Sequence, residues 1–570
     1  MKNKFFKILK FPFTIYFGLG IAILAVVSCE DDFLEQEPIT ALTVDAIQSE
    51  KDIEALVIAT YDPLKWQVFN NSSGHHYPVM FQDIRSDDVF SQWANFWAAG
   101  RVFDQNPVPP NNPSVLGWWR KWFTMVSRAN TAIGIIEESS DDLYAEPIAT
   151  KAKLIAEAKF LRGLAYFELV KNFGGVPVIT ERIVSANFNF KIKRGTPEEV
   201  YDQVIEPDLL AAAEALEATA IQKGRATSGA AYGFLAKAHL YQKEYLQTVK
   251  YTEKIMTLGY DLEENFGDNF SLNNEYGKES IFEIGYASNI IYNNFESPQS
   301  ILNQGSSTHQ MMGFLFNNIV NGESVPNSGF GNGVPRQSLI DFYDDSDQRK
   351  NATFITPKTT DLPTNLDGDE RGSISCGCQN NLPDDCAGID QSNSVDWLPN
   401  STDTYAYFWL VCDSDKKTLP SWTSKATMRK YHIPQSVQNS TLNFADSPLN
   451  EKILRYADVL LMHAEASLLG GGGDGASSFN KVVERAYGIS NAAAPTYTLQ
   501  GVKDERRREL ATEGWDRYTD LVRWGDAKSA LEAVGKIFVE NRDELLPIPQ
   551  SERDQVGGDI LTQNPGYPGE

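Results

Sequence analysis

The spacing of apolar residues between about 149 and 172 is the feature that most limits how this chain can fold. These residues recur every three or four positions, which places them on one face of an α-helix. The recurring positions are Leu154, Ala158, Leu161, Ala165 and Leu169. Gly174, Gly175 and Pro177 follow, and they stop the helical pattern. The sequence therefore predicts a long amphipathic helix that needs other helices to cover it.

Two further segments predict helical hairpins. Residues 226–258 combine small and apolar residues with a tight connection at 241–244, and so resemble a tetratricopeptide (TPR) unit. A second pair is expected at 449–469 and 477–486, joined by five Gly and one Asp. Both match the repeat consensus loosely. We therefore predict a mainly α fold with a scaffold of TPR-like hairpins rather than a regular solenoid.

Between the hairpins the composition changes. Residues 260–446 are rich in Asn, Ser, Gly, Asp and Pro, and they show only short β-like runs such as 280–284 and 405–411. A single loop of this length would be unusual in a compact domain. We expect an irregular, ligand-facing insertion, between an N-terminal helical region at 43–259 and a C-terminal region at 447–570.

The N-terminus predicts export. Residues 1–28 begin with four Lys and no acid, continue with an uncharged apolar stretch, and end in Val-Val-Ser before Cys29. This resembles a bacterial lipobox, in which the Cys is lipidated after cleavage. The alternative is an uncleaved membrane anchor, since the apolar run approaches the minimum length for spanning. We expect a lipoprotein signal peptide at 1–28 and a lipidated, acidic tether at 29–42.

Four cysteines remain in the exported chain, and an even number in an oxidising compartment favours disulfides. They are Cys376, Cys378, Cys386 and Cys412. Four cysteines allow three pairings, and the sequence does not choose among them. A zinc site is the alternative, but intervals of one, seven and 25 residues do not repeat the short pairs of structural zinc sites.

Charge and motif content exclude several function classes. The 76 acidic and 51 basic residues give a net charge of −25, which becomes −29 once the four Lys of residues 1–28 are removed. Such a chain is a poor ligand for nucleic acid. No nucleotide-binding, zinc-protease or serine-hydrolase motif occurs. No cofactor is expected, apart from a possible structural calcium at 365–370, where oxygen ligands alternate without full EF-hand spacing.

Four segments, in order along nearly the whole chain, resemble the SusD/RagB family of nutrient-binding lipoproteins. The first is Cys-Glu-Asp-Asp-Phe-Leu-Glu-Gln-Glu-Pro at 29–38, and the second runs from Ala-Glu-Ala-Lys-Phe-Leu-Arg at 156–162 to Phe-Gly-Gly-Val-Pro at 173–177. The third is Leu-Arg-Tyr-Ala-Asp-Val-Leu-Leu-Met at 454–462 with Ala-Glu-Ala at 464–466. The last combines 505–510, 520–525, 546–549 and 562–567.

The resemblance implies a helical fold with an irregular ligand-facing part, and a binding protein rather than an enzyme. It implies an outer-membrane location, anchored by lipid and facing outside. It also implies a partner, a TonB-dependent (SusC-like) transporter that would receive an oligosaccharide ligand. Two alternatives stay open: a peptide- or protein-binding member of the same family, and a surface glycoside hydrolase, for which the sequence offers no positive sign.

Glycan binders present aromatic rings to sugar faces and polar side chains to hydroxyls. Two aromatic stretches fit this pattern, one at 83–97 and one at 397–422. The first supplies the candidates Arg85, Asp87, Trp93, Asn95 and Trp97. The second supplies Trp397, Tyr405, Tyr407, Trp409 and Trp422, of which the central three share one face if extended. Tyr286 and Tyr292 are weaker candidates.

Other rings and charges are expected to serve the scaffold. Trp118, Trp119 and Trp122 lie in a helical pattern and should belong to the core, as should Trp524. Residues 506–508 are three arginines, which we expect on a salt-bridged helix rather than at an anion site. Glu513 and Arg517 have the i, i+4 spacing of a helical ion pair.

Overall fold

The computed structural model describes most of the chain from Ile47 onward. The described residues are 47–69, 74–75, 77–91, 98–184, 189–220, 222–287, 305–308, 312, 318–320, 323–325, 333–355, 427–431, 433, 437, 447–488 and 493–569. The predicted signal peptide, Cys29, the tether, the acidic loop at 365–370 and the four remaining cysteines lie outside them. In the described part of the chain, no helix combines the length and the apolar composition needed to cross a bilayer.

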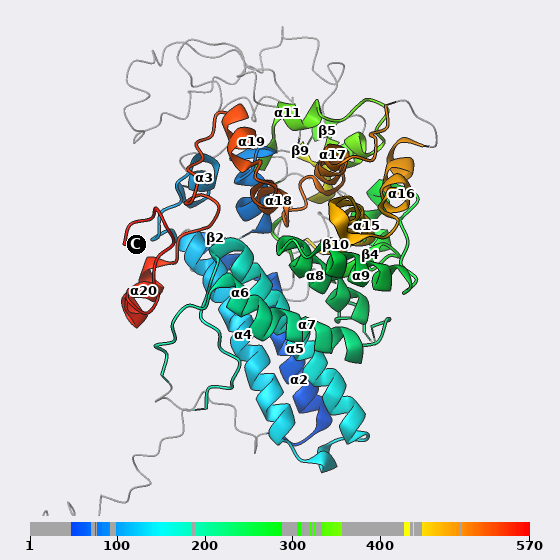
Figure 1. The fold of residues 1–570 in the computed structure, drawn as a ribbon. Helices are drawn as coiled ribbons and strands as arrows, with labels where there is room; N and C mark the ends of the chain where they lie inside the picture. Colours follow the sequence, from blue (N-terminus) through cyan, green and yellow to red (C-terminus); the bar gives the residue numbers. More distant parts are fainter. Residues whose placement is uncertain are drawn as a thin grey trace, which may run out of the picture.

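Three helices form the lower part of the molecule, where they lie side by side (Figure 1): α2 (Glu50–Tyr61), α4 (Pro113–Glu138) and α5 (Pro147–Phe173). Asn112 caps α4 by accepting hydrogen bonds from the amides of Ser114 and Val115, and Pro113 occupies the first turn. The predicted helix at 149–172 is confirmed as α5. Gly174, with φ of 71°, ends it as the sequence indicates.

The other described helices surround this group, and α7, α8, α9, α15 and α16 pack as successive neighbours (Figure 1). The described helices are α3 (Ala98–Gln105), α6 (Pro197–Val200), α7 (Glu206–Ala215), α8 (Ser228–Tyr241), α9 (Tyr245–Met256), α11 (Gln337–Ile340), α12 (Arg349–Thr353), α15 (Tyr456–Ala466), α16 (Gly475–Tyr487), α17 (Leu499–Leu510), α18 (Arg517–Trp524), α19 (Ala527–Ala533) and α20 (Gln550–Val556). The contacts run from α7 to α8, α8 to α9, α9 to α15 and α15 to α16. The mainly α fold is confirmed, and the hairpin predicted at 226–258 is α8 and α9.

One predicted helix begins too early. Residues expected to be helical from 449 include β10 (Glu451–Arg455), which pairs antiparallel with β4 (Ser280–Ile284), and the helix starts only at Tyr456. Every residue of β10 is buried, so its apolar positions carry no period that distinguishes a strand from a helix. The strand predicted at 280–284 is confirmed and supplies the partner.

The described strands are short and pair only in twos. Besides β4 with β10, they are β1 (Val68–Phe69) with β2 (Gly74–His75), β3 (Val89–Ser91) with β7 (Gly333–Pro335), β5 (Asn318–Val320) with β6 (Glu323–Val325), and β8 (Phe354–Ile355) with β9 (Thr427–Met428). These ladders are too small to form a core of their own. They fix where loops leave the helical scaffold and where they return to it.

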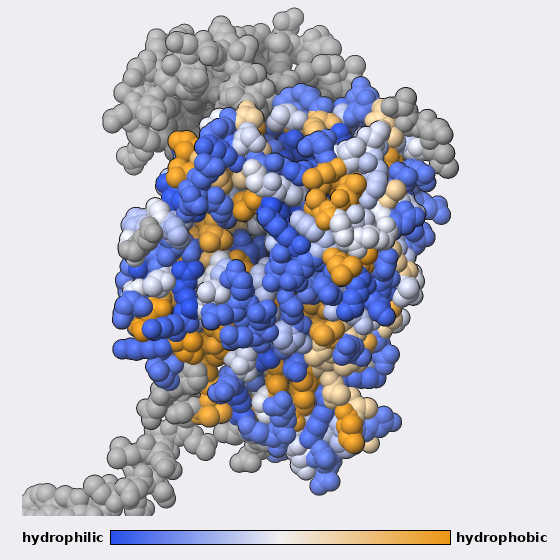
Figure 2. All heavy atoms as spheres, in the orientation of Figure 1, coloured by the Kyte–Doolittle hydropathy of each residue, from blue (hydrophilic) through white to orange (hydrophobic). Residues whose placement is uncertain are grey.

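Three of the four predicted core tryptophans are buried, and the prediction is wrong for Trp524. Trp118 and Trp122 are almost fully enclosed, and the Trp118 ring stacks on Phe81 with centroids 4.4 Å apart. Trp119 packs edge-on against Phe173 at 5.0 Å. Trp524 is only partly buried, and its indole N–H donates to Glu465 at 2.8 Å. The view in Figure 2 shows a mainly hydrophilic surface on which apolar side chains form separate patches.

Candidate functional site

The first predicted binding stretch rises from a rigid base. The π-helix η4 (Met80–Ile84), a turn at 85–88 and β3 lead into it, and α3 (Ala98–Gln105) follows it. Trp93, Asn95 and Trp97 lie between these elements, outside the described residues. The amide of Ser91, the last residue of β3, donates to Asp104 on α3 at 3.3 Å. The segment that carries the two tryptophans therefore has its ends joined to each other.

Arg85 belongs to the base rather than to a solvent-facing surface. Its side chain is 1 % exposed, lies 4.0 Å from the ring centre of Tyr518, and donates through Nη2 to the carbonyls of Asp543 and Leu545 at 2.6 and 3.0 Å. In this structure the guanidinium points into the protein. We therefore do not include Arg85 in the ligand-contact set proposed below.

Asp87 and its neighbour Asp88 are also buried, and arginines hold both of them. Arg517 Nη2 lies 2.8 Å from Asp87, and Arg507 Nη2 lies 3.1 Å from Asp87 and 2.6 Å from Asp88. Burial alone would raise the pKa of Asp87, but Arg517 and then Arg507 outweigh it and lower this pKa to about 2. Asp87 is thus a buried anion that fixes the turn, and it too leaves the proposed contact set.

These contacts correct one predicted pair and support another expectation. Arg517 reaches Asp87 rather than Glu513, because α17 ends at Leu510 and Glu513 lies outside the helix on which the i, i+4 spacing was based. Arg506 is buried and pairs with Asp458 and Asp520 at 2.6 and 3.1 Å. The arginines of this helix stabilise the scaffold, as predicted.

The strands that flank the segment containing the second aromatic stretch lie close to β3. Phe354 and Ile355 pair with Met428 and Thr427, so β8 and β9 hold the two ends of the segment 356–426 together. Strand β9 contacts β7, which pairs with β3. At Gly333 on β7, a Cβ atom would lie 3.2 Å from Met428 and 3.5 Å from Val89, so the three strands meet there. Trp397, Tyr405, Tyr407, Trp409 and Trp422 lie outside the described residues.

A third segment, 288–304, is rooted in a buried polar network close by. Gln67 Nε2 lies within 3.1 Å of four oxygens, which belong to Tyr286 on one side of the segment, to Ser306 and Thr308 on the other, and to Glu451, and its two N–H groups can donate to two of them at a time. Tyr286 therefore belongs to this buried network, and it is 8 % exposed. Tyr292 lies outside the described residues.

The same network connects the third segment to the first. Tyr77, just before η4, makes a 2.8 Å hydrogen bond between its hydroxyl and that of Ser307. Burial raises the pKa of Glu451 although several hydroxyl groups donate to it. Sequence reasoning missed Gln67, Ser306 and Glu451, because they lie more than 140 positions apart and share no local pattern. The roots of all three aromatic segments thus meet at one place.

The described part of the chain contains one cluster with metal-ligating atoms, and it lies elsewhere. Glu206, His239 and Glu244 offer atoms within 4.8 Å of one another at the α8–α9 connection. His239 Nδ1 is already 2.6 Å from Glu244 Oε2, which is an ordinary hydrogen bond. His239 is buried, and the hydrogen bond to Glu244 accounts for its position.

Comparison with known families places the chain. A family described as "Starch-binding associating with outer membrane" matches residues 32–240, and the family described as "SusD family" matches residues 252–567. The chain belongs to the SusD family. The SusD family match alone covers more than half of the sequence, and the two matches together reach from the predicted tether almost to the C-terminus.

Individual relatives agree with this SusD assignment. "SusD-like protein P25" of Formosa agariphila is 27 % identical over 93 % of this chain and 94 % of its own length. A "SusD-like protein" of Bacteroides ovatus is 25 % identical over 89 % of this chain and 81 % of its own length. These relatives match the whole chain rather than one region of it.

Solved structures share the SusD fold. A "Laminarin binding SusD-like protein" superposes with a TM-score of 0.70 at 25 % identity, covering 91 % of this chain and 100 % of its own. "Surface glycan-binding protein A from Bacteroides thetaiotaomicron in complex with laminarihexaose" superposes with a TM-score of 0.71 at 23 % identity and the same coverage. The helical scaffold described above is therefore the family scaffold.

Proposed function

We propose that this SusD protein binds an oligo- or polysaccharide with aromatic side chains of the segments 92–97, 288–304 and 356–426. The observation that carries the proposal is the meeting of their roots at β3, β7, β9 and the Gln67 network. Rings brought to one place on a rigid base can cover several sugar units. Such a base lowers the ordering cost of binding, because the loop ends are already fixed.

The proposed contact set is Trp93, Asn95, Trp97, Trp397, Tyr405 and Trp409, with Tyr292 of segment 288–304 as a weaker member. Tryptophan and tyrosine rings stack on the apolar faces of pyranose rings, while an amide such as that of Asn95 reads their hydroxyls. Because a structural relative is a laminarin-binding SusD-like protein, a β-glucan is the first ligand class to test. Binding without cleavage is the role we assign to the site.

We further propose that the protein acts at the outer membrane, held by a lipid on Cys29, and passes its ligand to a TonB-dependent transporter. The signal-like N-terminus and a family description that places its members at the outer membrane support this role. A tagged chain isolated from outer membranes should bring such a transporter with it. Cys29→Ala should release the protein from the membrane fraction, and unchanged membrane retention would contradict the lipid anchor.

Calorimetry tests the binding site directly. The chain lacking residues 1–29 is titrated with a polysaccharide panel that includes laminarin. We expect Trp93→Ala and Trp97→Ala each to weaken binding about fivefold or more, because one ring contact is worth about 1 kcal/mol. Leu246→Ala is the control, since Leu246 is 68 % exposed on α9 and outside the proposed contact set. Unchanged binding by both tryptophan variants would contradict the site.

A further inference from the structure

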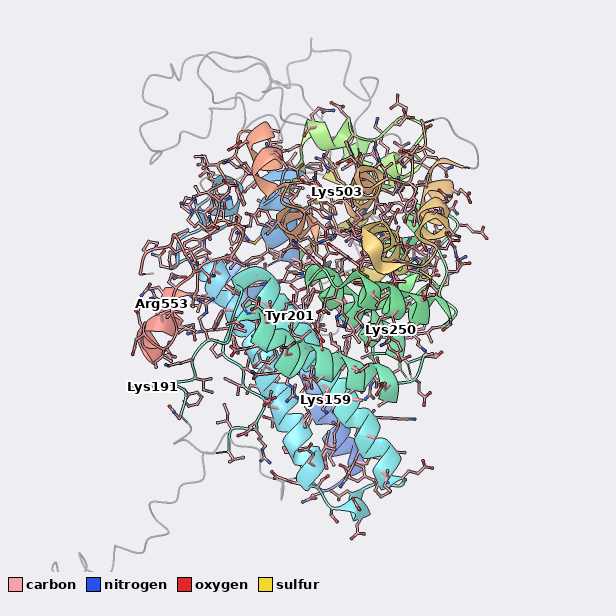
Figure 3. All side chains as sticks on the ribbon, in the orientation of Figure 1. Lys159, Lys191, Tyr201, Lys250, Lys503 and Arg553 are labelled. Atoms are coloured by element: carbon pink, nitrogen blue, oxygen red, sulfur yellow. The ribbon has the colours of Figure 1, made fainter. Side chains whose placement is uncertain are left out.

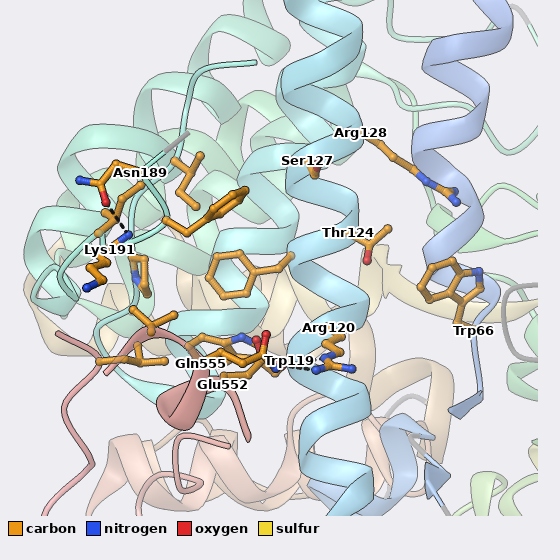
Figure 4. A pocket seen from close by; sticks show the side chains of 17 residues that line it. Trp66, Trp119, Arg120, Thr124, Ser127, Arg128, Asn189, Lys191, Glu552 and Gln555 are labelled. Atoms are coloured by element: carbon orange, nitrogen blue, oxygen red, sulfur yellow. Dashed lines mark hydrogen bonds and ion pairs between the residues drawn. The ribbon is translucent and has the colours of Figure 1, made fainter. Parts of the chain in front are cut away.

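A cavity lies beside α4, on the side of the helix that carries Trp119. It encloses about 1100 Å³ and is walled by α4, the segment after α5 and α20 (Figure 4). Trp118 of α4 faces Phe81 of η4, beneath the first aromatic segment, whereas the next residue, Trp119, lines this cavity. Its volume slightly exceeds the range of about 300–1,000 Å³ for sites that take small ligands. The cavity is thus distinct from the site proposed above.

Its floor combines rings with polar side chains at helical spacing. Trp119 and Phe123 lie with ring centres 4.8 Å apart, and Phe190 closes the cavity from the loop before α6 with 57 % of its surface exposed. Arg120 and Thr124 project from the same ridge of α4 (Figure 4). The floor therefore offers flat apolar surface beside hydrogen-bonding groups.

Internal carboxylates fix the polar groups at both ends of the ridge. Arg120 Nε donates to Glu552 of α20 at 2.7 Å. Asp62 accepts from the indole N–H of Trp66 at 3.1 Å and from Arg128 Nη1 at 2.9 Å, and Arg128 lies 5.4 Å from the centre of that indole ring. The guanidinium groups and the Trp66 ring are thus held in place without a ligand.

The walls are equally fixed. Arg194 donates to the carbonyl of Gly175 at 2.8 Å and to that of Thr562 at 2.8 Å, which ties the loop wall to the C-terminal segment. Arg553 of α20 donates to the carbonyl of Leu561 at 3.0 Å. Lys191 and Arg553 accordingly lie on the same side of the molecule (Figure 3). Because these walls are already ordered, the protein loses little conformational entropy when a ligand binds in the cavity.

We propose that this cavity is a second carbohydrate-binding site, which takes a short stretch of a neutral glycan. The ligand class rests on the proposed function, but the location and residues are independent of it. Arg120 and Arg128 are each neutralised by a carboxylate, so their planar groups are better suited to hydroxyls than to a strong anion. Trp66 and Phe190 supply the exposed ring surface for stacking, while Trp119, which is 4 % exposed, only lines the floor.

The test observes Trp66 itself. The chain has 11 tryptophans, so ¹⁵N-labelled indole groups give a small set of resonances, and Trp66→Phe assigns one of them. The protein carrying Trp93→Ala and Trp97→Ala is titrated with a panel of neutral hexasaccharides, laminarihexaose among them. We expect a saturable shift of the Trp66 resonance in this background. Phe190→Ala and Arg120→Gln should each weaken binding at this site about fivefold to tenfold, as measured from the glycan concentration at which the Trp66 shift is half complete.

Ile148→Ala is the matched control, because Ile148 is 89 % exposed at the start of α5, outside the cavity lining, and should leave the shift unchanged. If the unmodified protein binds a glycan but the Trp66 resonance does not shift, the proposal of a second site is contradicted while the proposed function stands. If no member of the panel binds either site, both proposals fail. A Trp66 shift in the double variant supports the second site alone.

Discussion

Arg455 lies at the centre of a buried cluster of charges. Its guanidinium is 2.9 Å from Glu509 and 2.6 Å from Glu513, and it also pairs with Glu279. The side chain is 1 % exposed. Removing Arg455 takes one counter-charge away from three carboxylates at once. Arg485, Arg349 and Lys430 still pair with them, but the buried cluster is left with an excess of negative charge, which is a costly change.

We therefore expect Arg455→Met to lower the free energy of unfolding by about 3–5 kcal/mol, measured by urea titration. Lys528→Ala is the control, because Lys528 pairs with Glu540 at 3.1 Å while both side chains are largely exposed. That change should cost less than about 1 kcal/mol. A loss of similar size in the two variants would show that burial of the Arg455 cluster does not matter to stability.

Asp87 predicts a pH effect. Its folded pKa of about 2 lies below the unfolded value of 3.8, so its contribution is complete above about pH 4 and is lost as pH falls through 2. The contribution amounts to about 2 kcal/mol. The stability gap between the native chain and Asp87→Asn should therefore narrow by about 1 kcal/mol from pH 5 to pH 3. A gap independent of pH would contradict this role.

For single residues, the sequence predicted the burial of aromatic rings better than the burial of charged side chains. Trp118 and Trp122 show their burial through helical spacing, which is a local signal. Arg85 and Asp87 stand in a polar stretch beside aromatic residues and looked like ligand contacts. Their partners lie at 507, 517, 543 and 545, more than 400 positions away, so no local pattern could show that they are buried.

At the scale of elements, helices were predictable where local spacing and caps agree. Helix α6 begins at Thr196, which forms a capping box with Glu199, and both signals stand in the sequence. Strand β10 was missed because its partner β4 lies about 170 positions earlier. The short ladders β3–β7 and β8–β9 were missed for the same reason, so the common root of the aromatic segments could not be predicted.

Gly175 tests the connection that follows α5. A Cβ atom there would lie 2.0 Å from the carbonyl oxygen of Gly195, which is a backbone atom, so no side-chain rotation can relieve the clash. We expect Gly175→Ala to lower the urea midpoint by the equivalent of about 1–3 kcal/mol, because the loop wall must shift. Gly267→Ala is the control, since its Cβ would meet Ala352 at an ordinary 3.5 Å. Equal stability of the two variants would contradict this close approach.

At the scale of the whole molecule, a net charge of −25 shapes which glycans can approach. A neutral hexasaccharide carries no charge to interact with this field, so its affinity should change less than about twofold between low and physiological salt. Any binding of an oligouronate should strengthen as salt is added, because salt screens the repulsion. Calorimetry at two ionic strengths measures both. Tighter oligouronate binding at low salt would indicate a local cationic site instead.

The family and the fold class followed from segments spread in order over the chain, since each segment is a local motif. The cavity beside α4 did not, because its rings come from Trp66, Trp119 and Phe190 on three separate elements. Trp119 was assigned to the core from its helical position. The structure shows that a nearly buried ring, which packs into the core from a helix, can still line the floor of a cavity.

The pairing of β8 with β9 has a consequence for the length of the segment between them. Because Ile355 and Thr427 are cross-strand neighbours, the chain leaves the scaffold and re-enters it about 5 Å away. The free energy of closing a loop between fixed ends rises by only about 0.6 kcal/mol for each doubling of its length. Insertions and deletions at this point therefore leave the scaffold nearly unaffected. We expect a chain shortened within this segment to keep the helical scaffold and its stability.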